Sequence, residues 1–292
     1  MYVPLSYRIL SWFSLRWSHR IGAAIGWLIA HAPNKPRDVA EKNIALCYPD
    51  LDEKQRRWLV KKSFSQTGKM LCELGPIWFG RSSASVLPLI VEIVGEKKIK
   101  RHLDAGQGVI LAAPHVGSWE VLGMYLSEHY QMTSMYKPLK GPFDASIRQS
   151  RERLGAKLVP SDNSGVKALL KGIKAGQLVG ILPDQDPSRE AGVFAPFFGN
   201  PANTPLLVVR LAQRTKAPVV FSWAERLPHG NGYRIHFIDA PDGLYDPDPE
   251  VAAAALNRGV ERCVGPNPEQ YWWSYPRFRR QPLGARSLYD PN

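Results

Sequence analysis

Cysteines, acidic residues and long apolar runs are scarce in this sequence of 292 residues. Its three cysteines, Cys47, Cys72 and Cys263, are scattered and form no CxxC pair. This argues against a disulfide framework or a cysteine zinc site and fits a reducing compartment. The longest clean apolar run near the amino terminus, residues 21–30, is about half of the ~20 residues that span a bilayer, so a simple transmembrane helix is disfavoured.

Several functional motifs are absent as well. No HxxxH or HxH spacing indicates a metal site, and no GxSxG motif indicates a serine nucleophile. No RNP-like, helix-turn-helix or zinc-finger pattern supports nucleic-acid binding. We therefore expect no metal ion and no covalent serine intermediate.

The shortage of acidic residues leaves a strongly basic chain. Lys and Arg number 38 against 26 Asp and Glu, which gives a net charge of +12. Such an excess favours an anionic partner: nucleic acid, a phosphorylated substrate or an anionic membrane. Residues 272–280 mix aromatics with arginines, a combination used both by single-strand binders and at membrane interfaces.

Residues 1–35 are apolar and aromatic, with basic interruptions at Arg16, His19 and Arg20. We interpret them as a separate helical segment that associates with a membrane at its interface. A buried helical hairpin of the core is the alternative. The side chains expected at headgroup level are Trp12, Phe13, Trp17 and Trp27.

Residues 36–292 are predicted to form one α/β domain that begins with helix over 38–80. From about residue 105, apolar strands alternate with amphipathic helices. This predicts a mostly parallel central sheet flanked by helices. The expected strands are 108–113, 133–136, 156–159, 178–182, 218–223 and 233–238, and the expected helices are 119–130, 144–154, 165–174, 205–214 and 249–264.

In such sheets, sites lie beyond the carboxyl ends of the strands. His115 follows the first of these strands, and Glu120 falls in the first turn of the next helix if Ser118 is its N-cap. The imidazole can then fold back to the carboxylate, so the pair is predicted to act as a catalytic dyad. A surface-turn histidine with an ordinary first-turn acid is the alternative.

Basic residues follow a later strand. Tyr136 and Lys137 come at its end, and Arg148 and Arg151 share one face of the next helix. Converging cations suit a phosphate or a developing oxyanion, and Arg151 is expected to reach Glu120 or the substrate. The alternative is a solvated helix face.

The segment 183–204 has no periodicity, which favours a functional loop. Asp184 and Gln185 follow a buried strand and are expected at the edge of the site. Phe194 and Phe197 either line an acyl-chain groove or pack in the core. The expected substrate-binding residues are Ser118, Tyr136, Lys137, Arg148, Arg151, Asp184, Gln185, Phe194 and Phe197.

The segment His115 to Glu120, HVGSWE, resembles the HxxxxD/E motif of glycerolipid acyltransferases. Further blocks in order make the chain similar to the late acyltransferases of bacterial lipid A synthesis. These are NIALCYP (43–49), MYKP (135–138), ILPDQ (181–185), GVFAPFFG (192–199) and PEQYWW (268–273).

The resemblance implies a fold like that of glycerol-phosphate acyltransferases and acyl transfer from an acyl carrier protein to a hydroxyl of a phosphorylated membrane glycolipid, a lipid A precursor. It also implies the cytoplasmic face of the bacterial inner membrane and no cofactor besides the acyl donor. One alternative uses acyl-CoA and another acceptor, such as a phosphatidylinositol mannoside, an ornithine lipid or a lysophospholipid. The other is a basic protein that binds lipid or nucleic acid without catalysis.

Overall fold

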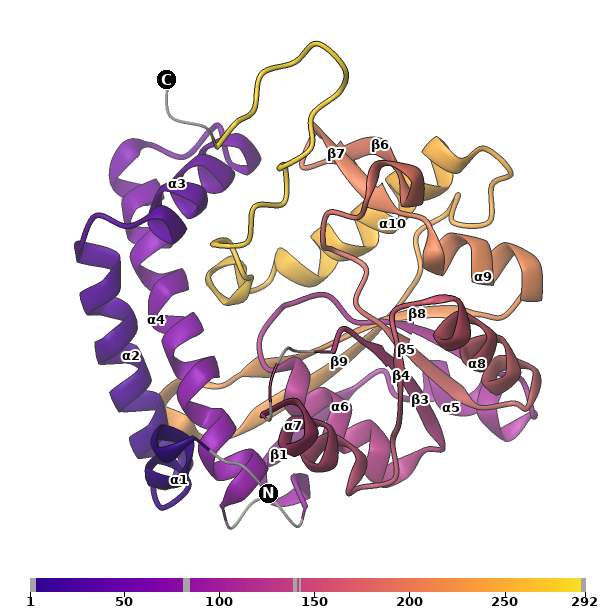
Figure 1. The fold of residues 1–292 in the computed structure, drawn as a ribbon, viewed down its shortest axis with the longest axis horizontal. Coiled ribbons are helices and arrows are strands. Elements are labelled where there is room, and N and C mark those ends of the chain that lie inside the picture. The colour runs from indigo at the N-terminus through magenta and orange to yellow at the C-terminus, as the bar shows by residue number, and fades with distance from the viewer. Residues whose placement is uncertain (1–3, 81–84, 139–140, 142, 290–292) are drawn as a thin grey trace.

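The computed structural model describes residues 4–80, 85–138, 141 and 143–289 (Figure 1). Its centre is a seven-stranded sheet in the order β1-β9-β8-β2-β5-β3-β4. These strands are β1 (Ile90–Val94), β2 (Val109–Ala112), β3 (Met132–Tyr136), β4 (Lys157–Pro160), β5 (Leu178–Ile181), β8 (Val219–Arg226) and β9 (Tyr233–Asp239). All neighbouring pairs are parallel except β8 with β9. The predicted α/β class with a mostly parallel sheet is confirmed.

The sheet is covered on both faces, which explains why its central strands read as continuous apolar runs. Along β2, Ile110 and Ala112 pack into one core, and Val109 and Leu111 into the other. Helices α8 (Asn163–Lys174), α9 (Leu207–Thr215) and α10 (Pro249–Val264) contribute to the first core. Helices α5 (Lys97–Asp104), α6 (Trp119–His129) and α7 (Phe143–Glu152) contribute to the second.

Two parts of this architecture were not predicted. Strand β1 and helix α5 precede the region where alternation was recognised, and β1 is a largely exposed edge strand. The segment 183–204 is not a plain loop: it contains a hairpin of β6 (Gly192–Phe197) and β7 (Asn200–Pro205). Phe198 and Gly199 form its two-residue turn with positive φ angles of 47° and 76°. Prolines in both strands and Phe where Asn is usual hide this hairpin from a pattern search.

Helices dominate the first eighty residues, as predicted. They are α1 (Leu5–Leu10), α2 (Leu15–His31), α3 (Lys35–Cys47) and α4 (Glu53–Phe79). Asp52 begins α4 with a capping box, because its side chain accepts from the Gln55 backbone and the Gln55 side chain accepts from the Asp52 backbone. Figure 1 shows α2 and α4 side by side along one flank of the molecule.

Helix α2 packs closely on α4 through glycines. A Cβ on Gly26 would lie 2.0 Å from the Phe64 carbonyl oxygen, so only glycine permits this approach. The exposed aromatics of α2 are Trp17 and Trp27, and Trp12, in the turn before α2, is 83% exposed. No helix in the described part of the chain has the length and apolarity needed to cross a membrane. One side of α2 is thus packed against α4, and the other side is exposed to solvent. The division at residue 35 stays a prediction.

Candidate active site

The loop between β2 and α6 carries His115 and is fixed by backbone hydrogen bonds. The Ser118 N–H donates to the Ala224 carbonyl at 2.8 Å, and the Gly117 N–H donates to the Gln270 carbonyl at 3.0 Å. Gly117 has a φ of +62°, and a Cβ there would lie 2.0 Å from the Ala224 oxygen. The loop therefore requires glycine at this position, and its anchors hold His115 at the carboxyl edge of the sheet.

The imidazole of His115 is held by Asp184. Its Nδ1 lies 2.8 Å from Asp184 Oδ1, and its backbone N–H donates to Oδ2 at 2.9 Å. The register of two neighbouring strands explains why His115 and Asp184 lie next to each other. Ala112 of β2 is paired with Ile181 of β5, and His115 and Asp184 each come three residues later. Equal steps beyond two parallel strands thus bring the two side chains together.

Electrostatics favour an ionised Asp184. The side chain is 2% exposed, and this burial raises its pKa. Attraction to His115 and the two hydrogen bonds from that residue outweigh burial, so the pKa of Asp184 lies below its ordinary value. A carboxylate only accepts, so the Nδ1 of the neutral ring carries the proton. The opposite nitrogen, Nε2, is then an acceptor and lies 3.2 Å from the Gln185 amide nitrogen.

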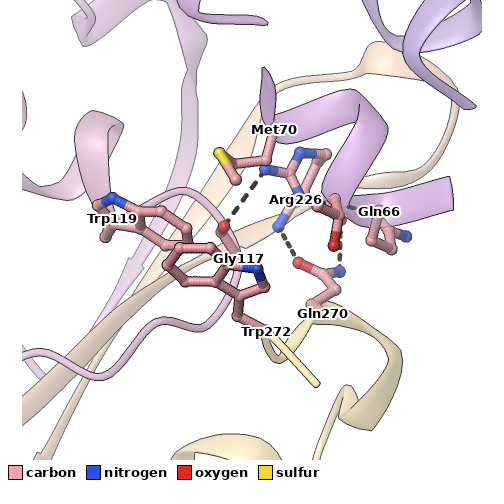
Figure 2. A pocket seen from close by; sticks show the side chains of 8 residues that line it. Gln66, Met70, Gly117, Trp119, Arg226, Gln270 and Trp272 are labelled. Atoms are coloured by element: carbon pink, nitrogen blue, oxygen red, sulfur yellow. Dashed lines mark hydrogen bonds between the residues drawn. The ribbon is translucent and has the colours of Figure 1, made fainter. Parts of the chain in front are cut away.

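Two indoles flank the His115 ring. The ring centroids of Trp119 and Trp272 lie 4.8 and 5.4 Å from that of His115, and the indoles stack on each other at 5.8 Å. Both border a small pocket, with Gly117 and Met70 as neighbours (Figure 2). The indoles give the histidine an apolar wall on the side of this pocket.

Behind this pocket lies a buried ion pair. The guanidinium of Arg226 on β8 binds both carboxylate oxygens of Glu73 on α4, at 2.6 and 2.8 Å. It also donates to the Gly117 carbonyl at 3.3 Å, and the Arg226 backbone N–H donates to the side chain of Gln270. His19 and Tyr233 complete the cluster through bonds to Glu73 Oε2. The pair thus ties the floor of the site to α2 and α4.

Comparison with known proteins identifies the family. A model described as bacterial lipid A biosynthesis acyltransferase matches residues 4–280. The chain belongs to this family. Because curated members are named as acyltransferases, an O-acyltransferase activity is supported, as is the predicted resemblance.

Three relatives illustrate the similarity to this lipid A acyltransferase family. The chain is 28% identical to the lipid A biosynthesis lauroyltransferase of Escherichia coli K12, over 93% of this chain and 88% of that protein. It is 30% identical to a lipid A biosynthesis acyltransferase of Haemophilus influenzae, over 97% and 87%. It is 28% identical to the E. coli palmitoleoyltransferase, over 99% and 91%.

The family's acidic motif residue, Glu120, does not hold His115 in this structure. Its carboxylate accepts two hydrogen bonds from Arg151, at 2.5 and 2.9 Å. The sequence predicted that Arg151 would reach either Glu120 or the substrate, and in the structure it binds Glu120. The described contacts join His115 to Asp184 instead. The predicted His115–Glu120 contact is therefore corrected. From the first turn of α6, Glu120 points to Arg151 on α7, whereas the register of β2 and β5 places Asp184 next to His115.

Other predicted residues lie apart from the histidine. Ser118 is buried at the N-cap position of α6, but its side chain caps no backbone N–H. Lys137 is exposed, and the exposed Arg148 pairs with Glu152. No contact among the described residues joins Tyr136, Lys137 or Arg148 to His115.

The two phenylalanines differ in burial. Phe197 is buried against Tyr271 and Phe278, which favours the core-packing alternative for it. Phe194 is half-buried on β6. The described residues contain no cluster of three His, Cys, Asp or Glu side chains that could hold a metal ion.

Sequence reasoning missed Trp272, Gln270 and the Glu73–Arg226 pair. Trp272 was interpreted as part of an aromatic and basic surface and of the PEQYWW block, yet its backbone N–H donates to the His115 carbonyl at 3.2 Å. No local pattern signals these contacts, because they join residues far apart in the chain. For Asp184 a signal existed: it follows a buried strand by the same number of residues as His115.

Proposed function

We propose that this protein transfers a fatty acyl chain from an acyl carrier protein thioester to a hydroxyl of a lipid A precursor, with His115 as general base. The family supports acyl transfer to such an acceptor. One observation carries the mechanism: the Nδ1 of His115 is held by the buried Asp184, while Nε2 remains an acceptor that meets the amide of Gln185.

In this mechanism the acceptor hydroxyl replaces the Gln185 amide at Nε2. The hydroxyl proton passes to Nε2 while its oxygen attacks the thioester carbonyl carbon. The carbon–sulfur bond then breaks, and the departing sulfur takes the proton from the imidazolium. Asp184 keeps the ring in the required tautomer and stabilises its positive charge. No serine or cysteine intermediate takes part.

Glu120 has a different task in this proposal. Its bidentate pair with Arg151 links the start of α6 to α7 and so steadies the helix that follows the His115 loop. The exposed Lys137, directly after β3, is available for an anionic substrate group, whereas Arg148 on α7 is paired with Glu152.

We also propose that the protein works at the cytoplasmic face of the bacterial inner membrane. The exposed Trp12, Trp17 and Trp27 support this, since tryptophans favour the membrane interface. Arg20 lies 5.0 Å from the Trp17 ring, so a cation accompanies the aromatics, as anionic headgroups require.

A transfer assay tests the proposal. Purified protein receives labelled acyl-acyl carrier protein and a tetraacylated lipid A precursor in anionic or neutral vesicles. We expect labelled product, formed faster on anionic vesicles. Parallel reactions replace the donor by acyl-CoA, or the acceptor by a phosphatidylinositol mannoside, an ornithine lipid or a lysophospholipid. Faster transfer in one of these reactions would mean that the proposed donor or acceptor is wrong and that the substituted compound is the better substrate. Salt-sensitive binding to lipid or nucleic acid without any turnover would contradict the enzyme.

A further inference from the structure

A second cleft adjoins the pocket beside His115. It has a volume of about 240 Å³ and lies between α4, the turn Pro228–Gly230 after β8, and the segment 267–270. Gln66, Arg226 and Gln270 line both spaces, and all three are visible in Figure 2. The cleft therefore adjoins the indole-lined pocket next to the His115 loop, to which Gly117 belongs.

The lining combines the apolar side chains of Leu227 and Pro228 with several polar groups. Glu225 is already paired with Arg234 and His236, and Arg226 with Glu73. The groups not engaged in ion pairs among the described residues are those of Lys69, Asn267 and Glu269, together with the amide of Gln66 and the imidazole of His229. Amides and a carboxylate suit the hydroxyls of a sugar, and an ammonium group suits a phosphate.

Lys69 is the cation that an anion would neutralise. It is half-buried, and no ion pair involves it among the described residues. Burial, followed by the nearby charges of Arg226 and Lys62, lowers the pKa of its amine, while Glu73 and Glu269 act in the opposite direction. An anion at Lys69 would therefore relieve an unfavourable positive environment.

The position of the cleft suits a lipid headgroup. The turn that walls it continues into Asn231, whose side-chain oxygen accepts a hydrogen bond from Arg16 at 3.1 Å. Arg16 is exposed on α2, next to the exposed Trp17. The cleft thus lies beside the aromatic surface that we propose to contact the membrane, where a headgroup and its acyl chains would separate.

We propose that this cleft binds the phosphorylated sugar of the acceptor lipid, with Lys69 on the phosphate and Gln66, Asn267 and Glu269 on sugar hydroxyls. The proposal rests on the proposed function. A neighbouring hydroxyl of the same headgroup then reaches Nε2 of His115 past Trp119 and Trp272. With about 240 Å³, the cleft is at the small end for ligand pockets, which fits one sugar phosphate.

The test uses Lys69→Met, Lys69→Arg and, as matched control, Lys61→Met, which removes an exposed cation eight residues earlier on the same helix. At saturating donor, Lys69→Met should raise the KM for a phosphorylated acceptor about tenfold or more, because a charge-assisted hydrogen bond is lost. Its kcat should stay within about twofold. Lys69→Arg should restore most of the KM, and Lys61→Met should behave as wild type. With a dephosphorylated acceptor, the KM of Lys69→Met should equal that of wild type.

An unchanged KM in Lys69→Met, with active wild type, overturns the cleft and leaves the proposed function intact. Equal losses with both acceptors overturn the phosphate contact. If the wild type transfers no acyl chain, the proposed function fails, and binding of soluble glucosamine 1-phosphate by calorimetry decides the cleft alone. Binding that Lys69→Met abolishes supports a sugar-phosphate site, and binding that is absent or insensitive to Lys69 overturns it.

Discussion

Two histidines of this molecule make nearly the same contact in two different places. Nε2 of His19 lies 2.7 Å from a buried oxygen of Glu73, and Nδ1 of His115 lies 2.8 Å from a buried oxygen of Asp184. Judged by the histidine–carboxylate distance alone, either pair qualifies as a dyad. Their surroundings make them different.

The carboxylate of Glu73 is shared. It also accepts from Arg226 and Tyr233, so its charge is already neutralised. The second nitrogen of His19 is buried with no hydrogen-bond partner, and burial lowers the pKa of that histidine. Such a ring stays neutral and receives no substrate. A histidine becomes useful as a base when its carboxylate is not committed to an arginine and its far nitrogen faces a space that a ligand can enter.

His115 differs from His19 in its partners. Its Nε2 meets the Gln185 amide, which a substrate hydroxyl can replace, and the stacked indoles of Trp119 and Trp272 border the adjoining pocket. Asp184 carries no arginine of its own in the described hydrogen bonds. The His19–Glu73 pair therefore has a structural role and the His115–Asp184 pair a catalytic one. Substitutions in the two pairs should have correspondingly different effects.

The largest difference should come from removing each imidazole. His115→Ala should reduce acyl transfer by about 10²- to 10⁴-fold with little change in stability, because the general base is lost. His19→Ala should lower the free energy of unfolding by about 1–3 kcal/mol and leave the kcat of the folded enzyme within a few fold. Transfer assays and urea denaturation of both variants measure this. Full activity in His115→Ala would remove His115 from the mechanism.

A smaller effect should distinguish the two carboxylates near the motif. Asp184→Asn should lower kcat by about 10²-fold, because the amide no longer fixes the Nδ1–H tautomer. Glu120→Gln should cost less activity and act through stability, since it weakens the pair with Arg151. The kcat of each variant at saturating substrates gives the comparison. A larger loss in Glu120→Gln than in Asp184→Asn would return the orienting role to Glu120.

The last comparison concerns acid stability, to which Glu73 contributes over a wide pH range and His19 by the smallest amount. Burial opposes ionisation of Glu73, but Arg226 and His19 outweigh it and lower its pKa to about 2. Its stabilisation, about 3 kcal/mol at neutral pH, should be lost as pH falls from about 4.5 towards 2. His19 acts in a higher window: its pKa is also lowered, so below about 6.5 the unfolded chain takes up a proton that the folded chain resists.

Urea midpoints measured between pH 7 and 5 isolate the His19 part. His19→Gln should lose less stability over this range than the wild type, whatever its absolute stability. His31→Gln, on an exposed residue of the same helix, is the matched control and should follow the wild type. An equal pH slope in all three proteins would mean that His19 contributes nothing to acid sensitivity.

Sequence patterns predicted the parts of this fold that depend on local order. Alternating apolar strands and helices after residue 105 placed β2, α6 and the His115 loop correctly. The partner of His115 was missed because it depends on which strand lies next to β2, and β5 takes that place only when the sheet assembles. Glu120 was chosen because it is near in sequence. The antiparallel pairing of β9 with β8 did have a local signal, because only residues 227–232 join the two strands and a parallel crossover needs about a dozen residues. The Phe198–Gly199 hairpin was missed because prolines interrupt both of its strands.

The site is closed by the carboxyl-terminal segment, and this has a consequence for synthesis. A ribosome that has finished α10 has made His115, Asp184 and all nine strands, but not Gln270, Trp272 or Arg277. These residues bind the His115 loop and the β7 hairpin strand. A nascent chain still attached at that point has the reactive groups but not the contacts that hold them in register. Acyl transfer should therefore begin only after residues 270–277 have been made and have packed against the His115 loop.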